Sequence, residues 1–150
     1  MYKKILVPID GSDTSALGLS EAIKLAMNQG SAIRLVHIVD EYVLDYAYSP
    51  GLYATNVIET MRATGQSVLD KATAVVKESG VPVESVLLET IGGPAADLIV
   101  GQAKSWPADL IVIGTHGRRG LRRLAMGSDA EQVLRAAPVP VLLIRRPEKA

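Results

Sequence analysis

The sequence contains no cysteine among its 150 residues. Without thiols the chain can form no disulfide framework, no thiolate nucleophile and no cysteine-ligated zinc or iron–sulfur site. An excess of charge is missing as well, because sixteen Lys and Arg are balanced by sixteen Asp and Glu and the formal net charge is zero. No overall field therefore favours a nucleic acid or an acidic membrane surface, and any specificity for an anion has to be local.

Long apolar runs are also absent. No stretch approaches the roughly 20 apolar residues that a membrane span needs. The apolar run near the start is interrupted by Pro8 and ended by Asp10, which makes it too short for a secretory signal. We expect no membrane partner and a location in the cytoplasm. Because 48% of the residues are hydrophobic, the chain can bury a core of its own, and residues 1–150 are predicted to form a single domain.

Familiar catalytic patterns are missing too. The sequence has no G-x4-G-K-[S/T] loop, no G-x-S-x-G elbow, no H-E-x-x-H helix and no G-x-G-x-x-G turn. Its two histidines, His37 and His116, are far apart, so they predict no metal site, and His37 is expected to pack at a strand end. Rapid phosphoryl transfer needs a base, metal ligands and a charge clamp together, so we predict no catalytic residue.

What the sequence does contain is a regular alternation of strand and helix patterns. Five short runs are near-continuously apolar, which predicts strands covered on both faces of a sheet. These runs are KILVPID, AIRLVHIVD, VESVLLET, DLIVIGT and VPVLLIRR. The segments between them place apolar side chains at helical spacing, such as Leu19, Ala22, Ile23 and Ala26. The order predicts an α/β fold, a doubly wound parallel sheet of five strands with helices on both faces.

The stretch from Asp40 to Asn56, DEYVLDYAYSPGLYATN, breaks this alternation. It has no clean period and holds four of the five tyrosines. Long loops in compact domains are usually functional or mobile, so we interpret the stretch as a flap after the second strand. A disordered or partner-packed segment is the alternative.

The stretch from Gly114 to Ser128, GTHGRRGLRRLAMGS, combines glycines and arginines after the fourth strand pattern. In open α/β sheets, ligands bind at the carboxyl ends of strands, near the point where the strand order reverses. Ser128 and Glu131 have capping-box spacing, which predicts that a helix starts there. The N–H groups of a glycine-rich turn and of a helix N-terminus attract negative charge. The stretch therefore predicts a phosphate-binding loop.

The spacing of Gly114, Gly117, Gly127 and Ser128, G-x2-G-x9-G-[S/T], resembles the nucleotide-binding signature of the universal stress protein family. The resemblance continues through ILVPIDGS, VHIVD, IVIGTHGRRG, MGSDAEQVL and PVPVLLIRR. It implies a Rossmann-like fold of the adenine nucleotide alpha hydrolase-like type. It also implies a homodimeric stress-response switch that binds an adenine nucleotide, ATP first or else ADP or AMP, with Mg²⁺ as a candidate companion. A slow ATPase or adenylate-processing enzyme and a dimeric scaffold that binds no nucleotide are the alternatives.

The resemblance implies two groups of site residues. Those that would line the adenine and ribose are Pro8, Ile9, Asp10 and Ile38. Those that would approach the ribose and hold the phosphates are Gly114, Gly117, Met126, Gly127 and Ser128.

Each of the polar residues in and near this site has an ordinary structural alternative. Asp10 would simply turn the chain before Ser12 or Asp13 caps the first helix, and Ser128 would only be an N-cap. Arg118 and Arg119 are candidate phosphate contacts because guanidinium groups bind phosphate in a fork, but a solvated face is the alternative. Asp129 stands where the family usually has a small or apolar residue. It either favours the helix dipole or weakens the binding of a triphosphate.

The last strand pattern, VPVLLIRR, bears on assembly. A terminal apolar strand would expose unpaired N–H and C=O groups at the edge of the sheet. The resemblance implies that this strand pairs with its symmetry mate in a homodimer. Pro138 and Pro140 would confine the pairing to part of the segment, because each lacks an N–H donor.

Overall fold

The computed structural model describes residues 1–41, 52–115 and 127–147. The strands are β1 (Lys4–Pro8), β2 (Ala32–Asp40), β3 (Val83–Thr90), β4 (Leu110–Gly114) and β5 (Val141–Ile144). The helices are α1 (Asp13–Gln29), α3 (Leu52–Glu78), α4 (Ala95–Ser105) and α5 (Ser128–Ala136). The strands form one five-stranded sheet in the order β3-β2-β1-β4-β5, and every neighbouring pair is parallel. The predicted doubly wound parallel sheet is confirmed.

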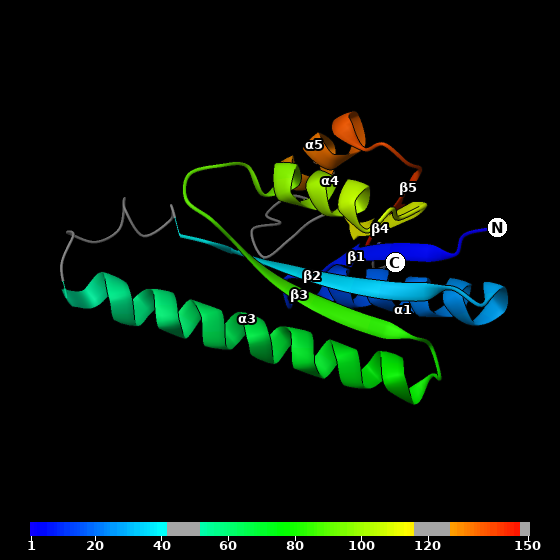
Figure 1. Ribbon diagram of the computed structural model, residues 1–150, viewed down its shortest axis with the longest axis horizontal. Helices are drawn as coiled ribbons and strands as arrows, with labels where there is room; N and C mark the ends of the chain where they lie inside the picture. The colour runs from blue at the N-terminus through cyan, green and yellow to red at the C-terminus, as the bar shows by residue number, and fades with distance from the viewer. Residues whose placement is uncertain (42–51, 116–126, 148–150) are drawn as a thin grey trace.

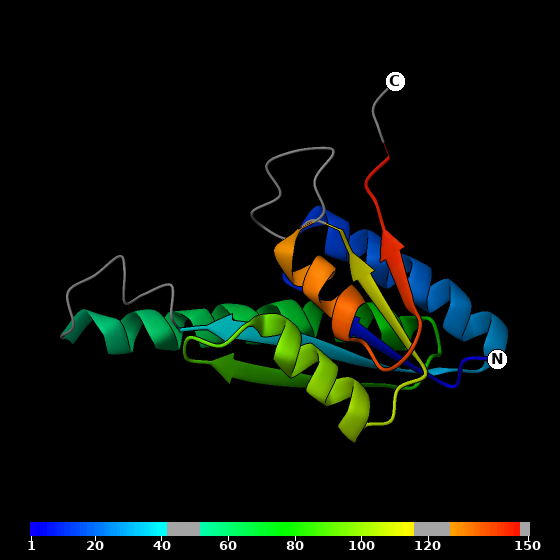
Figure 2. The ribbon, with the colours of Figure 1, turned by 90° about the horizontal axis from the view of Figure 1, so that it is seen from above.

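Helices cover both faces of the sheet. In Figure 1, α3 lies below the strands and α4 and α5 lie above them, and α1, which overlaps β2 in this view, shares one core with α3; Figure 2 shows the elements from above. Alternate side chains of β1 pack on opposite faces of the sheet. Ile5 and Val7 belong to the core between the sheet and α1 and α3, and Leu6 belongs to the core between the sheet and α4 and α5. Strands with apolar side chains on both faces read as continuous apolar runs, which explains the sequence pattern.

Burial differs between the middle and the edges of the sheet. The inner residues of β1 and nearly all of β4 are buried, whereas the two edge strands have exposed positions, three in β3 and one in β5. The prediction of strands covered on both faces is confirmed, and the cover is thinner at the edges, where Leu87 and Leu88 of β3 still pack against one core each.

The ends of three helices refine the expectations. Of the two predicted candidates, Ser12 and not Asp13 caps α1, since the Ser12 Oγ accepts the Ser15 N–H at 3.2 Å. The predicted capping box at Ser128 is wrong by one residue, because Gly127 is the N-cap of α5 and its carbonyl accepts the Glu131 N–H at 3.0 Å. The predicted flap is shorter than expected. Asp40 still belongs to β2 and α3 begins at Leu52, while residues 42–51 lie outside the described part.

None of the helices in the described ranges is both long and apolar enough to cross a membrane, and this includes α3 with its 27 residues.

Candidate functional site

The strand order reverses at β1, which has β2 on one side and β4 on the other. The carboxyl ends of β1 and β4 are therefore neighbours, and a ligand site is expected at this place in an open α/β sheet. The start of α5 is tied to the same edge, because the Gly127 N–H donates to the Thr115 carbonyl at 2.6 Å. The fold thus gathers Pro8, Gly114 and Gly127, which are far apart in the sequence, at one edge.

The chain that leaves β1 forms a tight, well-anchored turn. The Ile9 N–H donates to the Val36 carbonyl at 2.8 Å and continues the pairing with β2. Asp10 accepts the Ser12 N–H at 2.9 Å through Oδ1, while its own N–H donates to the Ser15 Oγ at 3.4 Å. Gly11 follows at φ +83°, a conformation that favours glycine. Asp10 therefore does turn the chain, and its contact with a ligand remains a prediction.

Ile38 lies two residues beyond Val36, the partner of Pro8 in the β1–β2 register, so it extends past the end of β1. Its half-buried side chain packs against the core beneath α4 and α5. The structure thus places Ile38 at the same edge as Ile9 and Asp10, and its predicted role beside adenine is left as a prediction.

Gly114 has a packing role that the sequence did not reveal. A Cβ built on Gly114 would lie 2.7 Å from the Thr14 Cγ2 and 3.0 Å from the Thr14 backbone carbon. The missing side chain therefore lets the first turn of α1 close on the end of β4. This contact explains the glycine without a ligand, and the predicted approach to ribose and phosphates stays a prediction.

The start of α5 carries no side-chain cap. Gly127 is extended, at φ −59° and ψ 146°, and no side chain hydrogen-bonds across the N-cap. Asp129 and Glu131 lie in the first turn, where negative charge favours the helix dipole. The predicted residues Gly117, Arg118, Arg119 and Met126 lie outside the described part of the chain.

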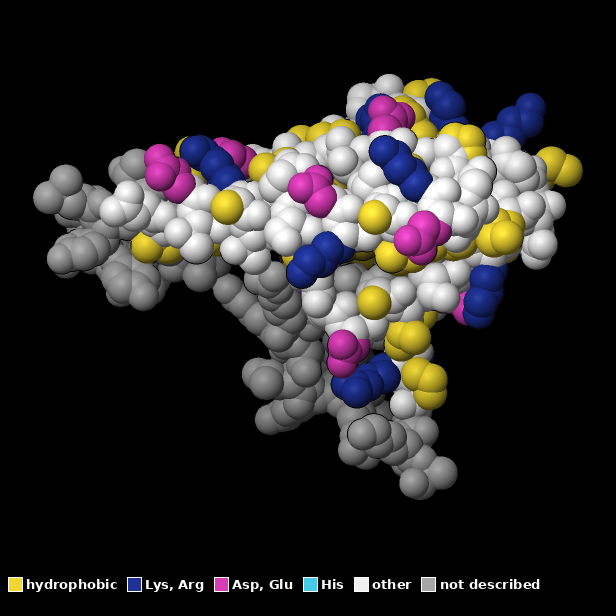
Figure 3. Space-filling model, turned by 90° about the horizontal axis from the view of Figure 1, so that it is seen from below, with side chains coloured by type: hydrophobic (Ala, Val, Ile, Leu, Met, Phe, Trp, Pro, Cys, Tyr) yellow, Lys and Arg dark blue, Asp and Glu magenta, His cyan; other side chains and the backbone are white. Residues whose placement is uncertain are grey.

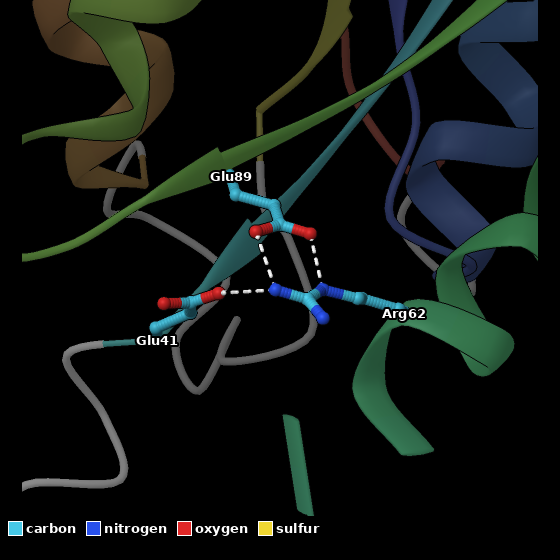
Figure 4. A network of polar contacts seen from close by, with 3 residues as sticks. All are labelled: Glu41, Arg62 and Glu89. Carbon is cyan, nitrogen blue, oxygen red and sulfur yellow. Dashed lines mark hydrogen bonds and ion pairs between the residues drawn. The ribbon is translucent and has the colours of Figure 1, made fainter. Parts of the chain in front are cut away.

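Sequence reasoning missed a charged cluster at the same edge of the sheet. Arg62 on α3 grips the carboxylate of Glu89 at the end of β3, through Nε to Oε1 and through Nη2 to Oε2 at 2.9 Å (Figure 4). The same Nη2 reaches the Oε1 of Glu41, just after β2, at 3.4 Å. The partners are 21 and 27 residues away from Arg62, so no local pattern could have indicated them.

The two carboxyl groups of this cluster are shifted in opposite directions. Burial raises the pKa of Glu41, whose side chain is 12% exposed, and the neighbouring Glu89 raises it further. Hydrogen bonds from Arg62 lower the pKa of Glu89, whose side chain is 35% exposed. One guanidinium therefore bonds two carboxyl groups, and it lowers the pKa of the more exposed one, Glu89, below its ordinary value.

The wider surface shows no collection of one charge on the face that Figure 3 presents, where basic and acidic side chains are interspersed. Within the described ranges, no three His, Asp or Glu side chains group together as a metal site would require. Near the ends of β1 and β4, the described residues offer backbone groups and the Asp10 carboxylate to a ligand, and the charged cluster of Arg62 lies at the ends of β2 and β3.

Comparison with known proteins identifies the family that the chain resembles in sequence and in structure. The model of the universal stress protein family matches residues 1–145. The universal stress protein MJ0531 of Methanocaldococcus jannaschii is 37% identical over 99% of this chain and 85% of its own length. UspA of Lactobacillus plantarum is 26% identical with a TM-score of 0.83, over 96% of this chain and 98% of that one. A universal stress protein of Archaeoglobus fulgidus solved in complex with dAMP is 28% identical with a TM-score of 0.66, over 96% and 98% of the two chains.

Proposed function

Since the chain belongs to the universal stress protein family, we propose that it binds an adenine nucleotide at the carboxyl edge of its sheet. The observation that carries the proposal is the junction of β4 and α5. The hydrogen bond from Gly127 to Thr115 sets a helix start without a side-chain cap beside the point where the strand order reverses. Such a helix start is suited to phosphate, and the Archaeoglobus relative was solved with dAMP.

In this proposal the site has two halves. Pro8, Ile9, Asp10 and Ile38 contact the base and ribose, and the backbone from Gly127 into α5 holds the phosphates. Gly114 and Gly117 give close approach between the halves, with Met126, Ser128, Arg118 and Arg119 as further phosphate contacts. ATP is the first candidate, with or without Mg²⁺, before ADP and AMP. The bound nucleotide then switches the protein in a stress response in the cytoplasm.

We also propose a homodimer that pairs through β5. This strand is an edge of the sheet, bonded on one side to β4, where the Ile111 N–H donates to the Pro140 carbonyl at 3.0 Å. Leu142 on β5 is 37% exposed. Pairing of two such edges satisfies N–H and C=O groups that a single chain leaves to solvent. Light scattering at micromolar concentration is expected to give the mass of two chains, and the mass of one chain would contradict the proposal.

The nucleotide proposal is tested by calorimetric titration of ligand-free protein with ATP, with and without Mg²⁺. Saturable binding of one nucleotide per chain is expected. Gly127→Val should weaken it at least tenfold, because a branched side chain crowds the helix start. The backbone conformation of Gly127 is open to any residue, so the variant should still fold.

The matched control is Gly101→Val on α4, where an added Cβ meets nothing within 4 Å. This variant should bind as the unchanged protein does. Equal affinity of Gly127→Val and the unchanged protein would overturn the location of the site. Absence of binding by ATP, ADP and AMP would overturn the proposal that the protein binds an adenine nucleotide, and would favour a dimeric scaffold.

A further inference from the structure

We propose that His37 is a positioning residue for the nucleotide site: its ring holds the Ile9 carbonyl and thereby fixes the turn that would contact adenine and ribose. The inference rests on the proposed function for its link to nucleotide. The hydrogen bond and its effect on the turn stand on the geometry alone.

The contact is a buried side-chain-to-backbone hydrogen bond. The His37 Nδ1 lies 2.9 Å from the Ile9 carbonyl oxygen, and the residues are 28 positions apart. A carbonyl can only accept, so Nδ1 carries the proton. Both residues are buried, at 8% and 6% exposure, so water does not readily replace this bond. Loss of the donor would leave a buried carbonyl without this partner, which is costlier than loss of an exposed bond.

The place of the contact gives it a function beyond packing. The registered pairing of β1 with β2 ends at Pro8 and Val36, and Ile9 is the next residue along the chain. From there β2 holds the departing chain at the Ile9 N–H, through the Val36 carbonyl, and at the Ile9 carbonyl, through the His37 ring. On the other side, Ser15 holds the Asp10 N–H. The peptide between Ile9 and Asp10 is therefore fixed from β2 and from α1.

Helix α3 makes room for the ring with a glycine. A Cβ on Gly65 would lie 2.6 Å from the His37 Cδ2 and 2.9 Å from its Nε2. Glycine is a poor helix former, yet here it occupies the interior of a 27-residue helix. The helix backbone can thus close directly over the imidazole, which fixes the ring in the orientation that reaches Ile9. This glycine explains how α3 contributes to the position of the ring.

Two substitutions at His37 separate the hydrogen bond from the packing. His37→Asn keeps an N–H donor near the position of Nδ1 but leaves space under Gly65, whereas His37→Leu fills the space and has no donor. We expect His37→Leu to bind ATP roughly tenfold more weakly, since one buried hydrogen bond is removed from the site's support. His37→Asn should bind within about twofold of the unchanged protein although its thermal midpoint falls, because the cavity costs stability and not orientation.

Hydrogen exchange at the Asp10 and Ser12 amides gives a readout that does not need nucleotide. Exchange should become roughly tenfold faster in His37→Leu and stay unchanged in His37→Asn, if the ring holds the turn. A second pair tests the helix: Gly65→Ala should loosen the same amides because its methyl displaces the ring, and Gly101→Ala, whose Cβ meets nothing within 4 Å, should not.

The outcomes separate the two proposals. Equal loss of ATP affinity in His37→Asn and His37→Leu, or unchanged exchange and affinity in His37→Leu, would overturn the positioning role. If the unchanged protein binds no adenine nucleotide, the proposed function fails, and the exchange rates still decide whether His37 holds the turn.

Discussion

The amino and carboxyl edges of the same sheet differ in the groups that they present. At the amino edge, side chains close the structure: the Trp106 ring lies 4.9 Å from the Arg34 guanidinium carbon and 5.5 Å from the Lys4 Nζ. The Asp109 carboxylate accepts the backbone N–H groups of Lys3 and Lys4 at 2.8 and 3.1 Å. At the carboxyl edge, where β1 and β4 end, glycine, a tight turn and a helix start without a side-chain cap present backbone groups instead.

This difference indicates a division of labour within one domain. Side-chain packing and charge-assisted hydrogen bonds favour a single closed arrangement, which suits the edge that only has to be stable. Backbone N–H groups at a helix start can bind an anion without a dedicated side chain, which suits the edge that is proposed to bind nucleotide. Substitutions at the amino edge should therefore change stability alone, while those at the carboxyl edge should change binding.

The largest expected effect is that of Trp106→Ala at the amino edge. Trp106 is 9% exposed and packs in the core beneath α4 and α5, so its truncation should cost about 3–5 kcal/mol of unfolding free energy. Urea unfolding measures this loss. The variant that remains folded should bind ATP as the unchanged protein does. A large loss of affinity at low urea would show that the two edges are coupled and would break the comparison.

The next effect in size is that of Gly114→Ala. This variant should lose both stability and ATP binding, because Gly114 packs against Thr14 and also belongs to the proposed nucleotide site. Its methyl would meet the Thr14 backbone at 3.0 and 3.1 Å, which a side-chain rotation cannot relieve. We expect a loss of roughly 1–3 kcal/mol in urea unfolding and weaker ATP binding. Gly101→Ala in the interior of α4 is the control, and should be neutral or stabilising by about 0.5–1 kcal/mol. Equal stability of the two variants would contradict the packing role of Gly114.

The sequence was sufficient for the parts that depend on local pattern. The apolar runs AIRLVHIVD and VESVLLET coincide with β2 and β3, and the alternation of patterns predicted the sheet, because burial on both faces leaves a continuous apolar signal. The cap of α1 at Ser12 followed from local chemistry in the same way. The one-residue error at Ser128 arose because a glycine can occupy an N-cap without any side-chain signal.

The parts that the sequence could not reveal depend on contacts between distant segments. The sequence predicts that Gly114 lets the backbone approach the ribose and phosphates. Its contact with Thr14 depends on how α1 packs against β4, which no local pattern indicates. Gly65 and His37 are 28 residues apart along the chain, and nothing near either residue indicates the other. The cluster of Arg62 with Glu41 and Glu89 likewise exists only because α3 crosses the ends of β2 and β3.

The smallest effects are expected from that cluster, and they concern the dependence of stability on pH. The lowered pKa of Glu89 means that its contribution to stability is present above the ordinary value of 4.5 and is lost as the pH falls through the lowered value. The raised pKa of Glu41 has the opposite sign: its contribution is present below 4.5 and is lost as the pH rises through the raised value.

At neutral pH the two carboxylates therefore have opposite effects on the stability of the fold. Replacing them should shift the thermal midpoint in different directions. Glu89→Gln should lower the thermal midpoint at about pH 7, since Arg62 loses the closer of its two charged partners, and the deficit should shrink as the solution is acidified. Glu41→Gln should leave the midpoint equal or slightly higher at about pH 7, because a neutral amide can still bond with Glu89 and needs no desolvation of charge. Thermal unfolding of both variants between about pH 3 and pH 8 measures the difference. A shift of both variants in the same direction at neutral pH would mean that Arg62 holds the two acids alike, and the carboxyl edge would then resemble the amino edge in being closed by side-chain charge.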